Sequence, residues 1–330
     1  MDRYTPPFAI TQGMIALISE ISELVGSITI WDSMNANPRL RKDSRVKTIH
    51  ASLAIENNTL SLEQITSIIN GKRILGAPRE IREVKNAYEV YEKLSAFDPF
   101  SVDDLLTAHR LLMDGLVGEN GRFRTGSVGV FAGDKLIHMA PPAALVPGQV
   151  AALLEWVRSD STHMLVKSCV FHYEFEFIHP FADGNGRMGR MWQTLLLSEW
   201  RPLFAWLPVE TLIRERQDQY YAALRQGDGT GRADPVILFL LTAIRDALRE
   251  IADSSAMDYS AYSPQVRKLL TALGSETLSG NEIMQRLHLK SRAAFRQNYL
   301  TPALGNGLVE MTLPDKPNSR NQKYRRSCGL

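Results

Sequence analysis

Residues 179–190, HPFADGNGRMGR, bring a histidine, a carboxylate, three glycines and two arginines into one short stretch. His179 can accept a proton near neutral pH, and Asp183 offers the hard oxygen that Mg²⁺ prefers. Arg187 and Arg190 are three residues apart, so on a helix their guanidinium groups lie on neighbouring parts of one face and suit phosphate oxygens. An anion cradle, a metal ligand, two cations and a base together predict phosphoryl or nucleotidyl transfer.

The glycines and the apolar pattern that follows predict the elements around this stretch. FADGNGR is too rich in glycine for a helix interior, whereas RMGRMWQTLLL has a helical pattern, so we expect a loop that leads into a helix. Unpaired N–H groups and the dipole at such a helix N-terminus attract anions. Gly184 and Gly186 are expected to adopt conformations that other residues avoid and to let a ligand approach the backbone closely.

Helical patterns dominate the chain up to about residue 250. Residues 79–97 predict an amphipathic helix, and Ser101 is a suitable N-cap for the helix that follows. Residues 126–142 depart from this pattern, because short apolar runs flank a GDK turn and two prolines follow, which predicts a β-hairpin. We therefore interpret residues 1–250 as an all-helical domain with a hairpin flap.

The C-terminal residues have a different pattern. Residues 251–262 are small and polar and are interpreted as a linker. Residues 263–330 predict three helical pieces, then a strand, a basic loop and a second strand, which is the order of a winged helix-turn-helix domain. The predicted fold class is therefore mainly α: a helical core with a β-hairpin flap, followed by a small winged helix-turn-helix domain.

Composition excludes several classes of protein. The 330 residues carry a net charge of +2 and contain Cys169 and Cys328 alone as cysteines, which does not make a disulfide framework and favours a reducing cytoplasm. The first residues lack the basic segment and apolar core of a signal peptide, and no apolar stretch is long enough to span a membrane. We therefore expect a cytoplasmic protein without membrane contact.

The stretch HPFADGNGRMGR matches the whole signature of the Fic family, and the chain resembles that family over most of residues 1–250. The resemblance implies an enzyme that transfers AMP from ATP to a Ser, Thr or Tyr hydroxyl of a target protein and releases pyrophosphate. It implies His179 as the base, Asp183 as the Mg²⁺ ligand and Phe181 as an apolar anchor beneath the loop. The ATP phosphates would be bound by Gly184, Asn185, Gly186, Arg187 and Arg190. A kinase branch of the family replaces the second glycine with lysine, so Gly186 favours nucleotidyl transfer.

The upstream stretch SLAIEN, residues 52–57, resembles the inhibitory motif of self-inhibited Fic proteins. Ser52 and Glu56 are four residues apart and would share one face of an inhibitory helix at about residues 45–57. The resemblance implies that Glu56 pairs with Arg190 and occupies the space that the γ-phosphate needs. Asn57 completes the motif.

Further expectations come from the same resemblance. An extended target segment would add a strand along the flap and present its hydroxyl to His179. Tyr220 and Tyr221 would line the adenine pocket. Whether the chain forms a homodimer is left open at this stage.

Several alternatives stay open at this stage. His172, Glu176 and His179 could bind zinc, although a structural role is favoured. Glu56 could instead activate water, so that the enzyme would remove AMP from a modified protein. A third hypothesis is a DNA-binding regulator whose Fic domain senses nucleotide, with contacts from the basic run Lys316, Arg320, Lys323, Arg325 and Arg326. A protein-docking role for the C-terminal domain is the other interpretation. His109 and His138 are interpreted as structural rather than catalytic.

Overall fold

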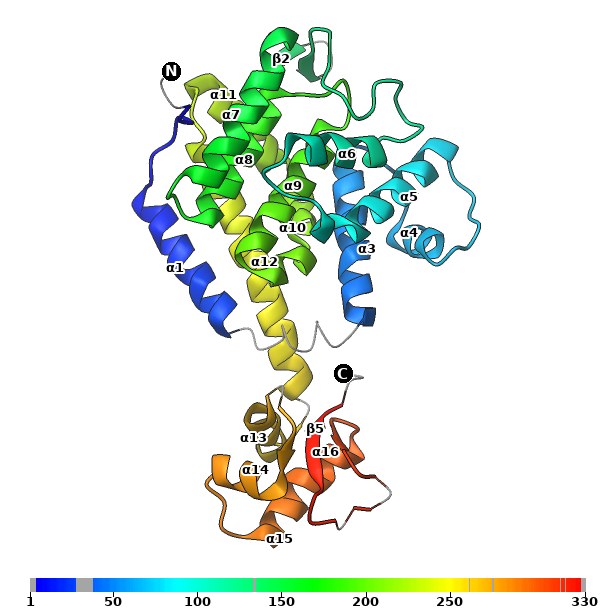
Figure 1. Cartoon of the computed structure of the whole chain (residues 1–330), viewed down its shortest axis with the longest axis vertical. Coiled ribbons are helices and arrows are strands. Elements are labelled where there is room, and N and C mark those ends of the chain that lie inside the picture. Colours follow the sequence, from blue (N-terminus) through cyan, green and yellow to red (C-terminus); the bar gives the residue numbers. More distant parts are fainter. Residues whose placement is uncertain are drawn as a thin grey trace. The chain divides into compact units, whose positions relative to one another are not determined.

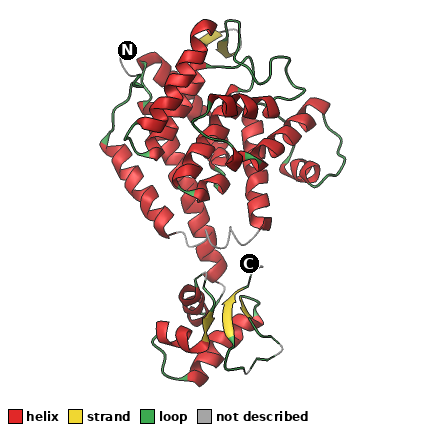
Figure 2. Ribbon diagram, viewed as in Figure 1, coloured by secondary structure: helices red, strands yellow, loops and turns green. Residues whose placement is uncertain are grey.

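The fold is that of a computed structural model, which describes residues 4–27, 38–132, 135–260, 262–274, 276–314, 316–317 and 319–327. Helices dominate these residues, as Figure 2 makes plain. The described residues divide into two compact units, one within Met1–Glu23 and Lys42–Leu248 and the other within Leu24–Arg41 and Arg249–Leu330. No helix among them is long and apolar enough to cross a membrane.

The first unit is built around two buried helices, α8 (Met164–Ile178) and α9 (Asn185–Trp200), which pack against each other. Nearly every residue of α8 is buried, including the polar Lys167, His172 and Glu174, so this helix lies in the core of the unit. Figure 1 shows the other helices around this pair. They are α1 (Gln12–Ser27), α3 (Pro38–Ile55), α4 (Leu62–Ile69), α5 (Pro78–Glu92), α6 (Val102–Leu112), α7 (Val146–Ser159), α10 (Val209–Glu215), α11 (Gln217–Thr230) and α12 (Asp234–Ser260).

The predicted hairpin is present as β1 (Gly129–Ala132) and β2 (Lys135–Met139), which pair in antiparallel fashion. A bulge between Val130 and Phe131 shifts the register. The glycine and aspartate of the expected turn, residues 133–134, lie outside the described residues. His138 lies in β2 opposite Val130, in agreement with its interpretation as a strand residue.

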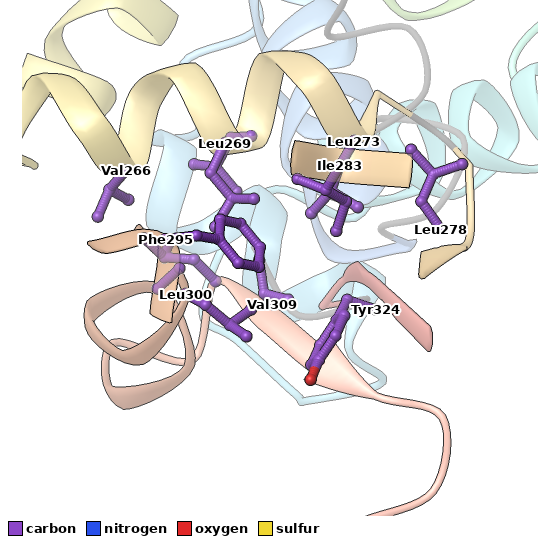
Figure 3. Close-up of a cluster of buried hydrophobic side chains, with 12 residues drawn as sticks. Val266, Leu269, Leu273, Leu278, Ile283, Phe295, Leu300, Val309 and Tyr324 are labelled. Carbon is purple, nitrogen blue, oxygen red and sulfur yellow. The ribbon is translucent and has the colours of Figure 1, made fainter. Parts of the chain in front are cut away.

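The second unit contains α13 (Pro264–Leu273), β3 (Leu278–Ser279), α14 (Gly280–Arg286), α15 (Arg292–Phe295), α16 (Thr301–Gly305), β4 (Val309–Met311) and β5 (Lys323–Arg326). Its sheet has the order β3-β5-β4, with both pairs antiparallel. Side chains from α13, α14, α15, β4 and β5 meet in one apolar core, shown in Figure 3. This connectivity is compatible with the predicted winged helix-turn-helix.

The structure adds two details to the predictions for the C-terminal part. Residues 251–260, interpreted as a linker, are helical, because α12 continues to Ser260 through a stretch without glycine or proline. Two residues of the basic run have partners within the second unit. Arg326 donates two hydrogen bonds to the Leu270 carbonyl, and Arg325 pairs with Glu310 across β4 and β5.

Candidate active site

The loop between α8 and α9 begins at His179, which takes the left-handed backbone conformation with φ 49°. The following Pro180 disfavours a right-handed helical conformation at this position, so α8 ends here. The buried Arg124 guanidinium fixes the turn by donating to the carbonyls of His179 at 2.7 Å and Ile178 at 3.2 Å. It also donates to the carbonyls of Gly126 and Pro141, on either side of the hairpin. Arg124 therefore ties the catalytic loop to the flap, a role that no sequence motif signalled.

The Asn185 side chain forms hydrogen bonds within its own loop. Its side-chain oxygen accepts from the Phe181 N–H at 2.8 Å, and its side-chain nitrogen donates to the Phe181 carbonyl at 2.9 Å. Both polar atoms thus brace the loop from inside. Phe181 is fully buried and stacks on the ring of His109 with centroids 3.7 Å apart, which confirms its role as an apolar anchor.

His109 is a buried structural residue, as predicted. Its Nδ1 accepts from the Gly121 N–H at 2.9 Å, so its Nε2 carries the proton and donates to the Asp183 carbonyl at 3.0 Å. Burial lowers the pKa of His109 to about 4, which keeps the ring neutral.

The catalytic-base candidate His179 is oriented by its own helix. Its Nδ1 lies 3.3 Å from the Glu176 carbonyl, an acceptor, so Nδ1 carries the proton and Nε2 keeps its lone pair. A neutral ring in this tautomer can accept a proton at Nε2.

The inhibitory motif forms the end of α3 and the turn after it. The helix ends at Ile55, so Glu56 lies just beyond it rather than on its face. Asn57 is left-handed with φ 66°, its N–H donates to the Ala54 carbonyl, and the Asn58 N–H donates to the Leu53 carbonyl. This is a Schellman turn, whose left-handed position favours glycine or asparagine. The contribution of Asn57 is therefore its backbone conformation.

Glu56 and Arg190 form the ion pair expected from the resemblance. Arg190 Nη2 donates to Glu56 Oε1 at 2.8 Å, and the guanidinium also donates to the hydroxyl and the carbonyl of Ser52 at 3.1 and 3.0 Å. The Arg190 side chain is 1% exposed and that of Glu56 is 35% exposed. Burial by itself lowers the pKa of Arg190, but Glu56, Tyr220 and Glu176 together raise it above its ordinary value.

Arg187 is buried and only partly satisfied. Its Nη2 donates to Asp183 Oδ1 at 3.3 Å, and its Nη1 lies 3.5 Å from Glu83 Oε1 on α5. Among the described residues, the Nε and Nη1 atoms of Arg187 have no hydrogen-bond partner. Unpaired donors on a 5% exposed guanidinium are costly, and an anion at the start of α9 would satisfy them.

The two loop glycines serve different purposes. Gly184 is left-handed with φ 85° and caps α9, as expected. Gly186 lies inside the first turn of α9 and needs no unusual conformation, contrary to expectation. A Cβ there would collide with Glu56 Oε1 and lie 3.0 Å from Arg190 Nη1. The missing side chain at position 186 therefore makes room for the Glu56–Arg190 pair.

Tyr220 and Tyr221, which were both expected to line the adenine pocket, have different environments in the structure. Tyr220 is 2% exposed and its hydroxyl lies 2.8 Å from His172 Nε2, so it is a core residue rather than an adenine contact. Tyr221 is 38% exposed and accepts from Gln217. Burial lowers the pKa of His172 to about 3, and no cluster of three metal-binding side chains occurs within the described ranges. The zinc hypothesis is therefore wrong.

Asp183 can hold a magnesium ion that arrives with a polyphosphate. Its side chain is 40% exposed, with Oδ1 accepting from the Gly184 N–H at 2.6 Å and Oδ2 from Arg79 Nη2 at 3.2 Å. Mg²⁺ is commonly bound through one or two carboxylates plus substrate phosphates. A single accessible carboxylate beside the unpaired donors of Arg187 fits that arrangement.

Comparisons with known proteins match two parts of the chain to described domains. Residues 99–197 match the Fic/DOC family, and residues 264–327 match the C-terminal domain of Fic-like proteins, "Filamentation induced by cAMP protein Fic-like". The solved structure of a Fic family protein from Desulfovibrio desulfuricans G20 is 52% identical, with a TM-score of 0.74 and 98% of each chain covered.

Two curated relatives are more distant. Protein adenylyltransferase fic-1 of Caenorhabditis elegans is 30% identical to this chain over 200 residues. These residues are 56% of this chain and 37% of the relative's length. A probable protein adenylyltransferase of Aquifex aeolicus is 27% identical over 76% of this chain and 71% of its own length. Because the Desulfovibrio likeness extends over nearly the whole of both proteins, the chain belongs to the Fic family.

Proposed function

We propose that the chain transfers AMP from ATP to a hydroxyl group of a target protein and releases pyrophosphate. The observation that carries the proposal is the start of α9, where the buried Arg187 has two unpaired donors and Arg190 is held by a carboxylate from the turn after α3. Two buried arginines at a helix N-terminus, next to an accessible carboxylate and a histidine, fit a polyphosphate and an attacking hydroxyl.

The residues divide the reaction among them. The hydroxyl oxygen attacks the α-phosphorus, its proton passes to His179 Nε2, and the bond to the β-phosphate oxygen breaks so that pyrophosphate leaves. Arg187 binds the β-phosphate and Arg190 the γ-phosphate, both through charge-assisted hydrogen bonds. Asp183 would hold Mg²⁺, which would supply charge neutralisation at the phosphates. Arg124 fixes the position of His179 relative to the base of the hairpin. A target segment adds as a further strand along β1 or β2.

The same geometry supports autoinhibition. Glu56 occupies Arg190 Nη2, so the γ-phosphate cannot take that donor while the inhibitory turn is docked. ATP bound without this contact would hold its α-phosphorus out of line with the incoming hydroxyl. The Glu56–Arg190 contact is the observation that supports this proposed inhibition.

Labelled ATP tests both claims. Three purified proteins are incubated with ATP carrying a labelled α-phosphate, Mg²⁺ and cell lysate. They are the wild type, Glu56→Gly, and the double variant Glu56→Gly with His179→Ala. We expect Glu56→Gly to incorporate more AMP than wild type, and the further change His179→Ala to abolish incorporation. Equal incorporation by wild type and Glu56→Gly would contradict the inhibition, and label that survives His179→Ala would contradict the base.

Removal of AMP is the competing activity, because an exposed Glu56 carboxylate could activate water instead of only blocking Arg190. Incubation with a protein that already carries AMP distinguishes the two. Free AMP that appears with wild type and disappears with Glu56→Ala would favour removal over transfer.

A second candidate function belongs to the C-terminal unit. Residues 264–327 contain eleven Lys and Arg against four Asp and Glu, a net charge of +7, whereas the whole chain carries +2. Glu276 and Glu310 are neutralised within the unit by Arg286 and Arg325. Exposed basic side chains remain on the loop before α15, on α15 and along the β4–β5 connection: Lys290, Arg292, Lys316, Arg320 and Lys323. This distribution supports a winged helix that binds duplex DNA, with α15 and the residues after it entering the major groove.

Gel shifts of the full-length chain with a random-sequence duplex test DNA binding. We expect affinity that falls as salt rises, and a smaller salt slope for the double variant Arg292→Glu and Lys323→Glu. Lys85→Glu on α5 of the first unit is the matched control and should bind like wild type. A protein that gives no shift at low salt, or a double variant that binds like wild type, would exclude this function.

A further inference from the structure

One carboxylate on α5 contacts both the inhibitory turn and a phosphate-binding arginine. Glu83 Oε2 accepts from Asn58 Nδ2 at 2.8 Å, and Glu83 Oε1 lies 3.5 Å from Arg187 Nη1. Arg79 Nε lies at the same distance, 3.5 Å, from Oε1. The Glu83 side chain is 11% exposed, so these contacts occur where water screens charges weakly.

Asn58 belongs to the inhibitory turn itself. It follows Asn57 directly, and its backbone N–H closes the Schellman turn that places Glu56. It is 7% exposed, and its side-chain nitrogen has the Glu80 carbonyl as a second acceptor at 3.3 Å. A movement of the turn therefore changes what Glu83 Oε2 is bonded to.

A neighbouring contact joins the same two segments without reaching the phosphate site. Glu80 Oε1 accepts from the N–H of Thr59 at 2.6 Å and from its hydroxyl at 2.9 Å. Glu80 thus contacts the turn but not Arg187, whereas Glu83 contacts both the turn and Arg187. The two carboxylates form a natural pair for a controlled experiment.

We propose that Glu83 is a positioning residue that couples the inhibitory turn to phosphate binding at Arg187, independently of the Glu56–Arg190 pair. With Asn58 in place, Glu83 is held back at 3.5 Å from Arg187 Nη1, and this leaves Nη1 and Nε able to donate to an anion. Without the Asn58 donor, the Glu83 carboxylate closes on Arg187 and competes with the phosphate. The inference rests on the proposed role of Arg187 as a phosphate ligand.

The experiment removes the Glu56 route and the chemistry before it measures binding. All variants carry Glu56→Gly and His179→Ala, so that ATP binds without turnover, and ATP with Mg²⁺ is titrated in a calorimeter. We expect Asn58→Ala to weaken ATP binding by roughly three- to tenfold, the range of one hydrogen bond. The same change should have no effect once Glu83→Gln is present, because the competing charge is gone.

Thr59→Val is the matched control, because it removes a contact of the turn with Glu80 only. It should leave the ATP affinity unchanged. If Asn58→Ala fails to fold, as judged by thermal melting, Asn58→Ser takes its place. An Asn58 effect that persists with Glu83→Gln, or no Asn58 effect at all, overturns the coupling. Failure of the parent variant to bind any ATP overturns the proposed function as well.

Discussion

Replacing Asn57 by valine changes the inhibitory turn without removing any side chain that contacts Arg190. Asn57 has φ 66°, a conformation that asparagine tolerates and that a β-branched residue strongly disfavours. Valine would therefore weaken the Schellman turn and with it the placement of Glu56. We expect Asn57→Val to raise basal AMP incorporation.

The size of the effect follows from the backbone. A left-handed conformation costs an ordinary L-residue about 1–2 kcal/mol, and asparagine less. If this cost destabilises the docked turn relative to the undocked turn, the population of the undocked turn rises by about 5- to 30-fold. Basal incorporation should rise by the same factor, up to the level of Glu56→Gly. Asn57→Gly, which tolerates the conformation, should not exceed wild type.

Initial rates of labelled AMP incorporation measure this directly, with wild type, Asn57→Gly, Asn57→Val and Glu56→Gly compared at one ATP concentration. Thermal melting verifies that Asn57→Val remains folded. If Asn57→Val stays at the wild-type rate while Glu56→Gly is activated, the turn geometry does not position Glu56 and the reasoning is refuted.

Three further predictions concern the support of the site. Arg124→Ala should lower the free energy of unfolding by about 3 kcal/mol or more, because four carbonyls lose a charged donor. Urea denaturation measures this loss, and a loss below about 1 kcal/mol would contradict the anchoring role of Arg124. Tyr220→Phe should cost about 1–3 kcal/mol in the same assay, because buried His172 Nε2 loses its partner, whereas Tyr221→Phe should be nearly neutral. Burial raises the pKa of Glu176 to about 8, so its contribution to stability is fully present below its ordinary pKa of 4.5 and is lost as pH rises through 8. Denaturation at several pH values should therefore give a slope of up to about 1.4 kcal/mol per pH unit between these values that Glu176→Gln removes, and identical slopes would rule this out.

Features that a short stretch encodes by itself could be predicted from the sequence. The glycine-rich loop, the helix after it and the hairpin each depend on neighbouring residues, and the structure confirms all three. The bonds of the Asn185 side chain to Phe181 could not be predicted, since a carboxamide bonds its own loop as readily as a phosphate. Arg124 is 55 residues from His179, and only the folded chain brings its guanidinium to that carbonyl.

The burial of Tyr220 did have a signal in the sequence. Tyr220, Ala223 and Gly227 are buried at helical spacing on α11, so the period alone places Tyr220 on the inner face and Tyr221 away from it. The role of Glu83 had no such signal, because its two partners come from segments far away in the sequence.

The close approach at Gly186 also constrains how relatives of this chain can diverge. A side chain at position 186 would occupy the volume that the Glu56 carboxylate fills, so the two positions cannot vary independently. A lineage that acquires a larger residue at 186 must first lose or relocate its inhibitory carboxylate. The pair is therefore expected to covary among homologues: an intact inhibitory glutamate should accompany glycine, and its loss should come before or with any replacement.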